Sequence, residues 1–214
     1  MNTLPIYCIN LDEATDRWSR VQHRLAAYGL DARRWSASTS ADVTASSKAF
    51  APAINDRQRA CALSHYLLWE HCLQQEHTHV LILEDDAVFR KDWVSVIDAQ
   101  LTQPAWAALF LNVSEDVPQH NQWVSCRRQC LTGAAIYTHD TLLWLVSVFR
   151  QTLYASDWMT QILQEHLPCL TYFPWLVIQE GVDSYIQEGV PKADLAKVHR
   201  LLSEASYGLE NYDL

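Results

Sequence analysis

The sequence predicts a single α/β domain in which a mixed β-sheet is flanked by helices. Apolar runs typical of strands, such as residues 6–11 and 80–83, alternate with segments whose apolar residues recur at helical spacing. The 214 residues, 49% of them hydrophobic, suffice for one substantial core and lie near the upper end of single-domain sizes. We therefore expect one domain over residues 1–190 and a C-terminal tail over residues 191–214.

The N-terminal part is expected to form a strand, a helix, a loop and a second helix. The run IYCINL over residues 6–11 predicts the first strand, and residues 12–28 show helical spacing through Trp18, Val21 and Leu25. Residues 37–56 have no convincing periodicity and predict a long loop, which in a compact domain is usually functional or mobile. Helical spacing returns over residues 59–75.

The alternation continues toward the C-terminus. The run VLIL over residues 80–83 predicts a buried parallel strand, followed by a helix through Trp93, Val96 and Ile97. Beyond these we expect two further strands, over residues 106–113 and 132–137, and two helices, over residues 141–149 and 156–166. An extended segment broken by Pro174 is expected over residues 170–179, and one short amphipathic helix in the tail over residues 192–214.

Composition excludes several function classes. The net charge of -9 argues against nucleic acid as a partner, because phosphate binding requires clustered Lys and Arg. Six cysteines are too few for a disulfide scaffold, so we expect reduced thiols. The N-terminus lacks the pattern of a signal peptide, and no segment reaches the apolar length that spans a bilayer. These features predict a soluble, cytoplasmic protein.

Three consecutive carboxylates, Glu84, Asp85 and Asp86, end the second strand. In an open α/β sheet ligands bind beyond the carboxyl ends of the strands, and divalent cations such as Mn²⁺ or Mg²⁺ take oxygen ligands. On an extended segment Glu84 and Asp86 would point to one side and share one ion, whereas Asp85 would face a basic side chain or a helix N-terminus. A solvated surface turn is the alternative.

The chemistry expected of such a site is group transfer from a nucleotide donor. A cation would neutralise the leaving diphosphate while a carboxylate deprotonates an acceptor hydroxyl. The chain contains no GxxxxGK[ST] motif and no GxGxxG after the first strand, which argues against P-loop and dinucleotide-binding proteins.

Several stretches in fixed order resemble glycosyltransferase family 25, the lipopolysaccharide-type and collagen-type sugar transferases. They are IYCINLDEATDRWSRV, ACALSHYLLW, VLILEDDAVF, GAAIY and FPWLVIQEGVDSYI, and they span most of the chain. ACALSH followed by LEDDA is the specific part. The resemblance implies a GT-A type, Rossmann-like fold, a UDP-hexose donor such as UDP-galactose, and a divalent metal, Mn²⁺ first and Mg²⁺ second, at the acidic motif.

The resemblance also implies roles for individual residues. Glu84 and Asp86 would hold the metal, with Glu84 also near the donor ribose. Residues expected to bind the donor, some of which could also contact the acceptor, are Asn10, Arg17, Ser64, His65, Glu84, Asp85, Gln179 and Ser184. The catalytic base would be a carboxylate on the acceptor side, with Asp157 favoured over Glu180 and Asp183.

Each role has a structural alternative. Arg17 could be a surface charge on a helix, His65 a core histidine, Ser64 a packing hydroxyl, and Asp157 the N-cap of its helix. The family often has glycines before the ACALSH-like helix, where this chain has residues 56–60 without glycine. That departure could alter donor choice or be a neutral extension of the helix, since Ala favours helix over Gly by roughly 1 kcal/mol.

The sequence therefore predicts a metal-dependent, inverting glycosyltransferase that moves galactose from UDP-galactose onto a lipopolysaccharide or other lipid-linked glycan, with exposed Trp or Tyr stacking on acceptor sugars. Peripheral contact with the inner face of the inner membrane is part of this hypothesis. Three alternatives stay open: a transferase using UDP-glucose or UDP-N-acetylglucosamine, a catalytically silent module that binds nucleotide sugars, and a nucleotidyl- or phosphotransferase using the same acids.

Overall fold

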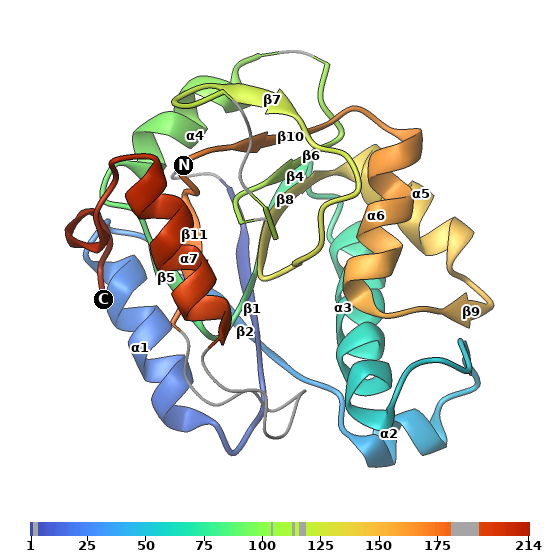
Figure 1. Ribbon diagram of the computed structural model, residues 1–214. Coiled ribbons are helices and arrows are strands. Elements are labelled where there is room, and N and C mark those ends of the chain that lie inside the picture. Colours follow the sequence, from blue (N-terminus) through green and yellow to red (C-terminus); the bar gives the residue numbers. More distant parts are fainter. Residues whose placement is uncertain (2–3, 104, 113, 116–118, 181–192) are drawn as a thin grey trace.

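A computed structural model describes residues 1, 4–103, 105–112, 114–115, 119–180 and 193–214, with side chains described outside 193–196. In this part of the chain a central sheet of seven strands has the order β2-β1-β4-β8-β6-β10-β7 (Figure 1). Strand β1 runs parallel to β2 and β4, and β6 runs parallel to β10, whereas β8 is antiparallel to both β4 and β6. The predicted mixed α/β sheet is confirmed.

The strands of the central sheet are β1 (Ile6–Asn10), β2 (Arg33–Ser36), β4 (His79–Glu84), β6 (Ala108–Phe110), β7 (Trp123–Ser125), β8 (Ala134–Thr138) and β10 (Cys169–Tyr172). Two small sheets pair β5 (Ala87–Phe89) with β11 (Val177–Gln179) and β3 (Ala49–Phe50) with β9 (Thr152–Leu153). The helices are α1 (Thr15–Ala26), α2 (Ser40–Ala45), α3 (Asp56–Gln74), α4 (Trp93–Leu101), α5 (His139–Val148), α6 (Ser156–His166) and α7 (Ala193–Glu204), with a 3₁₀ turn at Leu209–Asn211.

Helices cover both faces of the central sheet. Figure 1 shows α1 and α4 on one side and α3, α5 and α6 on the other. Alternate residues of β1 and β4 point to opposite faces, so Cys8 and Leu83 join the cluster beneath α1 and α4, whereas Ile9 and Ile82 join the cluster beneath the other three helices. Burial on both faces explains why 80–83 is apolar at every position.

Most of the predicted elements are present, with shifted ends. The first strand, the helices after the first and second strands and the two helices over 141–149 and 156–166 all form close to their expected positions. Residues 37–56 are less irregular than predicted, because Thr39 and Asp42 form a capping box that starts the short helix α2. Strands β2, β5 and β7 are too short or too polar to show a clear period.

Residues 56–60, which contain no glycine, form the first turns of α3. Asn55 caps this helix by accepting a hydrogen bond from the Gln58 backbone N–H, and the Gln58 side chain accepts one from the Asn55 N–H. The interpretation of this segment as an extension of the helix is confirmed.

The described part of the tail packs against the domain. Leu201, Leu202 and Tyr212 are buried in the same apolar cluster as Ile9 and Ile82, and the Tyr212 hydroxyl donates to the Trp175 carbonyl at 2.7 Å. All six cysteines are free thiols, as predicted. None of the helices in the described ranges combines the length and apolar character needed to cross a bilayer.

Candidate functional site

The acidic motif lies where two parallel neighbours, β1 and β4, end. Ile9 pairs with Glu84 in the parallel register, so Asn10 and the three acids share the carboxyl edge of the sheet. Glu84 is the last residue of β4, and the chain then turns at Asp85 and Asp86 into β5. The expectation that residues 84–86 are extended is therefore wrong, and the three carboxylates contact different sets of neighbours.

Asp85 is buried between a side-chain amide and a guanidinium. It accepts a hydrogen bond of 2.6 Å from Asn10 Nδ2, and Arg17 Nε of α1 lies 3.2 Å from its other oxygen. Asn10 is itself 1% exposed and accepts a hydrogen bond from Arg34 Nε. The prediction that Asp85 faces a basic side chain is confirmed, and Arg17 is a partner of the acidic motif and not a surface charge.

Asp86 is less well paired. One carboxylate oxygen lies 3.6 Å from Arg17 and accepts a hydrogen bond of 3.3 Å from Gln179 Nε2, but the buried oxygen Oδ1 has no hydrogen-bond partner among the described residues. Burial and the nearby charge of Glu84 raise the pKa of Asp86 to about 7. A buried carboxylate oxygen without a partner is costly unless a bound ligand or ion satisfies it.

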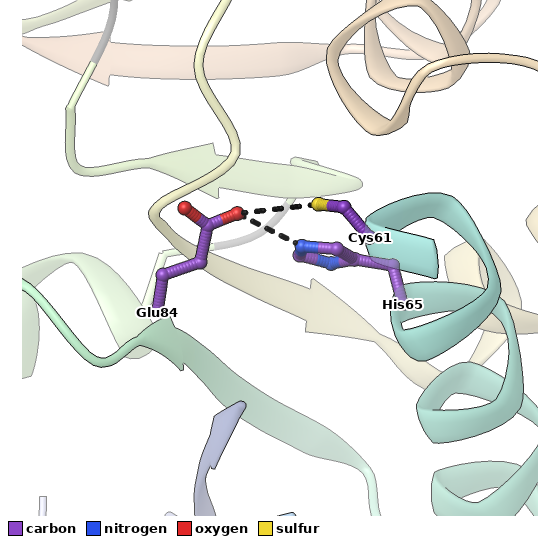
Figure 2. Close-up of side chains that lie close together, drawn as sticks. All are labelled: Cys61, His65 and Glu84. Atoms are coloured by element: carbon purple, nitrogen blue, oxygen red, sulfur yellow. Dashed lines mark hydrogen bonds and ion pairs between the residues drawn. The ribbon is translucent and has the colours of Figure 1, made fainter. Parts of the chain in front are cut away.

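Glu84 faces α3, where Cys61 and His65 are one turn apart. His65 Nε2 lies 3.1 Å from Glu84 Oε1, and the Cys61 sulfur lies 4.0 Å from the same oxygen (Figure 2). His65 is fully buried, and its Nδ1 has no partner within the described structure, so we assign the ring proton to Nε2, which donates to Glu84. His65 is thus both a core residue and a contact of the acidic motif.

These neighbours stabilise the ionised form of the Glu84 carboxyl group. Burial opposes its ionisation, but the hydrogen bond from His65 and the positive charge of Arg17 outweigh burial and lower the pKa of Glu84 below its ordinary value. Burial and the Glu84 charge raise the pKa of the Cys61 thiol, so Cys61 is a neutral thiol and a poor nucleophile in this state.

Two hydroxyls that the sequence did not single out complete this cluster. Thr132 Oγ1 donates to Glu84 Oε1 at 3.4 Å and to Ser156 Oγ at 3.2 Å, and Ser156 Oγ lies 3.4 Å from the Cys61 sulfur. Thr132 precedes β8, and the antiparallel pairing of β8 with β4 brings it beside the end of β4. The sequence pattern did not reveal that β8 runs antiparallel to β4, and without that orientation the contact between Thr132 and Glu84 could not be predicted.

Asp157 lies in the first turn of α6, directly after Ser156. The N-cap of α6 is Ala155, so the alternative that Asp157 is the cap is wrong, although its Oδ1 accepts a hydrogen bond from the Trp158 N–H. Burial raises the pKa of Asp157, and the charge of Glu84 raises it further, although backbone hydrogen bonds oppose the rise. The adjacent Ser156 contacts Cys61 and Thr132, which places Asp157 next to the cluster around Glu84. A higher pKa makes Asp157 a stronger base.

Glu180, the second candidate base, is held in ion pairs. Arg20 Nε and Arg24 Nη2 of α1 lie 3.0 and 2.9 Å from its two oxygens, and its backbone N–H donates to the Asp86 carbonyl. Although burial opposes it, hydrogen bonding and charge from the two arginines lower the pKa of Glu180. Glu180 is therefore suited to anchoring the end of β11 to α1 more than to accepting a proton.

Replacing Glu180 with Gln is expected to destabilise the protein at pH 7 by about 1.5–3 kcal/mol, near the lower end because Arg20 is partly exposed. A depressed pKa stabilises the folded state above the unfolded value near 4.5, and this contribution is lost as the pH falls through the folded value. Denaturant unfolding of both proteins at pH 7 and at pH 3 should therefore show a difference that shrinks in acid.

Glu165 offers a matched control, because its ion pair with Arg128 is largely exposed. Glu165→Gln should change the free energy of unfolding by at most roughly 1 kcal/mol. Equal effects of the two substitutions would contradict the anchoring role of Glu180.

Of the remaining residues predicted to belong to the site, Gln179 contacts the acidic motif, whereas the hydroxyl of Ser64 has other partners. Ser64 donates to the Ala60 carbonyl and accepts from the Ser38 N–H at 2.8 Å, so its hydroxyl connects α3 to the segment after β2. Gln179 joins the site through Asp86. Asp183 and Ser184 lie outside the described residues, and their roles stay predictions.

Comparison with known protein families identifies a match. The model of a family described as glycosyltransferase family 25 (LPS biosynthesis protein) matches residues 3–143. This range includes both parallel strands that end at the acidic motif, helix α3, and Glu84 with its contacts Cys61, His65 and Thr132. No curated protein matches the chain.

Proposed function

The chain belongs to glycosyltransferase family 25, a family of lipopolysaccharide-biosynthesis glycosyltransferases, and from this premise we propose that it transfers galactose from UDP-galactose to a glycan acceptor with inversion at the anomeric carbon. The donor site of this proposal is the carboxyl edge of β1 and β4. The acceptor is the oligosaccharide of lipopolysaccharide or a related lipid-linked glycan, reached by peripheral contact with the inner membrane.

The partly unpaired Asp86 carries the proposal. Three carboxylates meet at one sheet edge, Arg17 contributes one positive charge to them, and the buried oxygen Asp86 Oδ1 has no hydrogen-bond partner among the described residues. Oxygen donors with excess negative charge fit a hard divalent cation such as Mn²⁺ or Mg²⁺. Asp86 and Glu84 would hold this cation, which when bound neutralises charge on a diphosphate leaving group.

Protein groups supply the remaining functions. Arg17 and Asn10 fix Asp85 and the turn of the acidic motif, and this preorganises the donor site. Asp157 accepts the proton of the attacking acceptor hydroxyl, because it lies near the acids and its pKa is raised. Trp158 beside it is 41% exposed, and its ring offers a stacking face to an acceptor sugar. The sheet order, with β8 antiparallel between two parallel sets, supports a GT-A type fold.

The proposal is tested by UDP release from a panel of UDP-galactose, UDP-glucose and UDP-N-acetylglucosamine, with and without Mn²⁺, using water as the acceptor. We expect metal-dependent release from UDP-galactose, and calorimetry on the same samples should show that UDP binds only when Mn²⁺ is present. Release from another donor would move the assignment to that sugar. Failure of every nucleotide to bind in the presence of metal would overturn the proposal.

A further inference from the structure

Helix α3 and the end of β4 bring together three side chains of different donor chemistry. Cys61 and His65 are four residues apart on α3 and so lie on one face of the helix, opposite Glu84. The sulfur, the Nε2 nitrogen and a carboxylate oxygen of this cluster all lie within 4.8 Å of one another, and Figure 2 shows the three side chains pointing toward a common centre.

We propose that Cys61, His65 and Glu84 form a binding site for a zinc-class divalent cation, distinct in its chemistry from the Mn²⁺-type site proposed for Asp86. Thiolate, imidazole and carboxylate are the three ligand types that Zn²⁺ takes in proteins, whereas Mn²⁺ and Mg²⁺ favour oxygen. The inference goes beyond the transfer reaction and does not depend on it.

The distances require little rearrangement. Tetrahedral zinc with bonds of about 2.0–2.3 Å separates its ligand atoms by roughly 3.3–3.7 Å. His65 Nε2 and Glu84 Oε1 are 3.1 Å apart, and the Cys61 sulfur is 4.0 Å from the same oxygen. The third pair, the Cys61 sulfur and His65 Nε2, is bounded by the 4.8 Å span of the cluster. Closing this triangle around an ion therefore needs side-chain shifts of up to about 1 Å.

Charge and protons also balance. The cation replaces the thiol proton of Cys61, which leaves to solvent, and the His65 ring proton moves from Nε2 to Nδ1 so that Nε2 can bind the ion. The thiolate and the Glu84 carboxylate then carry two negative charges against a divalent cation. Ser156, 3.4 Å from the sulfur, is the first residue of α6, and the positive end of that helix favours a thiolate.

A fourth ligand position remains for solvent or a hydroxyl. Thr132 Oγ1 and Ser156 Oγ border the cluster and contact Glu84 and Cys61 respectively, so the described neighbours are polar. A site with three protein ligands and one exchangeable position is the arrangement that open zinc centres show. Because Glu84 is shared with the proposed donor site, a cation here would also hold Glu84 against α3.

The test is titration of the metal-free, reduced protein with Co²⁺, without nucleotide. We expect one equivalent to give a thiolate-to-cobalt charge-transfer band in the near ultraviolet, displaced by Zn²⁺. Cys61→Ser should abolish the band, and Cys130→Ser, the matched substitution of another half-buried cysteine, should keep it. Asp86→Asn should also keep it, which separates this site from the Mn²⁺-type site.

A second measurement uses the unaltered protein, so it does not depend on how the variants fold. Zn²⁺ should slow maleimide modification of Cys61 at least several-fold, as peptide mass spectrometry would show, and leave the rate at Cys130 unchanged. A cobalt spectrum without a thiolate band, a band that persists in Cys61→Ser, or equal protection of both cysteines would overturn the proposal.

Discussion

Replacing Asp86 with Asn is expected to lower metal-dependent sugar transfer by roughly 10²–10³-fold, the effect of removing one group that stabilises developing charge at a preorganised site. The substitution keeps the shape of the side chain and its contact with Gln179 but removes a ligand oxygen and a negative charge. We expect calorimetry to show Mn²⁺-dependent UDP binding weakened in the same variant, because in the proposed donor site the cation would join the diphosphate to the protein.

Stability distinguishes a functional role of Asp86 from a structural one. In the metal-free protein its Oδ1 is buried without a hydrogen-bond partner in the described structure, beside Glu84 and Asp85. Removing its charge should therefore leave the free energy of unfolding unchanged or raise it. Asp85→Asn is the matched comparison. Burial raises the pKa of Asp85 as well, but Asp85 accepts from Asn10 and pairs with the largely buried guanidinium of Arg17, so removing this charged partner should destabilise the protein. A strongly destabilised Asp86→Asn variant would argue for a structural carboxylate.

Replacing Asp157 with Asn is expected to reduce kcat by roughly 10²–10⁴-fold, the usual contribution of a general base, with little change in the KM for the donor. A base acts in its deprotonated form, so wild-type activity should fall as the pH drops through the pKa of Asp157. Because that pKa is raised, this acid limb should lie above the ordinary range of Asp, and it should be absent from the kcat profile of Asp157→Asn.

Asp140 provides the control for Asp157. It occupies the first turn of α5 as Asp157 occupies the first turn of α6, and it is exposed. Asp140→Asn should cost roughly 0.3–1 kcal/mol of stability through the lost interaction with the helix N-terminus. Asp157→Asn should leave stability unchanged or raise it, because the raised pKa of Asp157 means that the folded state disfavours its charge. Activity should change only for Asp157→Asn. A normal kcat in that variant would remove Asp157 as the base and leave Asp183, outside the described residues, as the candidate to examine.

Part of the structure around the acidic motif could be predicted from local sequence. An apolar run that ends in three acids is enough to predict a buried strand with polar chemistry at its carboxyl end, because burial on both faces forces every position of the run to be apolar. The pairing of Asp85 with a basic side chain was also predictable, since a buried carboxylate requires a partner. The extended path assumed through Asp86 was wrong, because a two-residue turn into β5 leaves almost no periodic signal.

The contacts of Glu84 could not be predicted from local sequence. Its contacts come from residues 61, 65 and 132, and residue 156 contacts residues 61 and 132 in turn. Only the packing of α3 and α6 on the same face of the sheet brings these residues together. Likewise, Glu180 is an acid near the site by sequence, and only the position of Arg20 and Arg24 on α1 identifies it as an anchor.

By itself, therefore, the sequence determined the α/β class, the main strands and helices, the family and the place of the acids at the end of a buried strand. These properties depend on hydrophobic period and on short motifs, which neighbouring residues encode. The tertiary structure alone decided which way each carboxylate faces, that β8 runs antiparallel beside β4, and that a thiol and an imidazole meet Glu84. Those contacts join segments far apart in the chain, and their orientation depends on how the whole core packs, for which no local pattern exists.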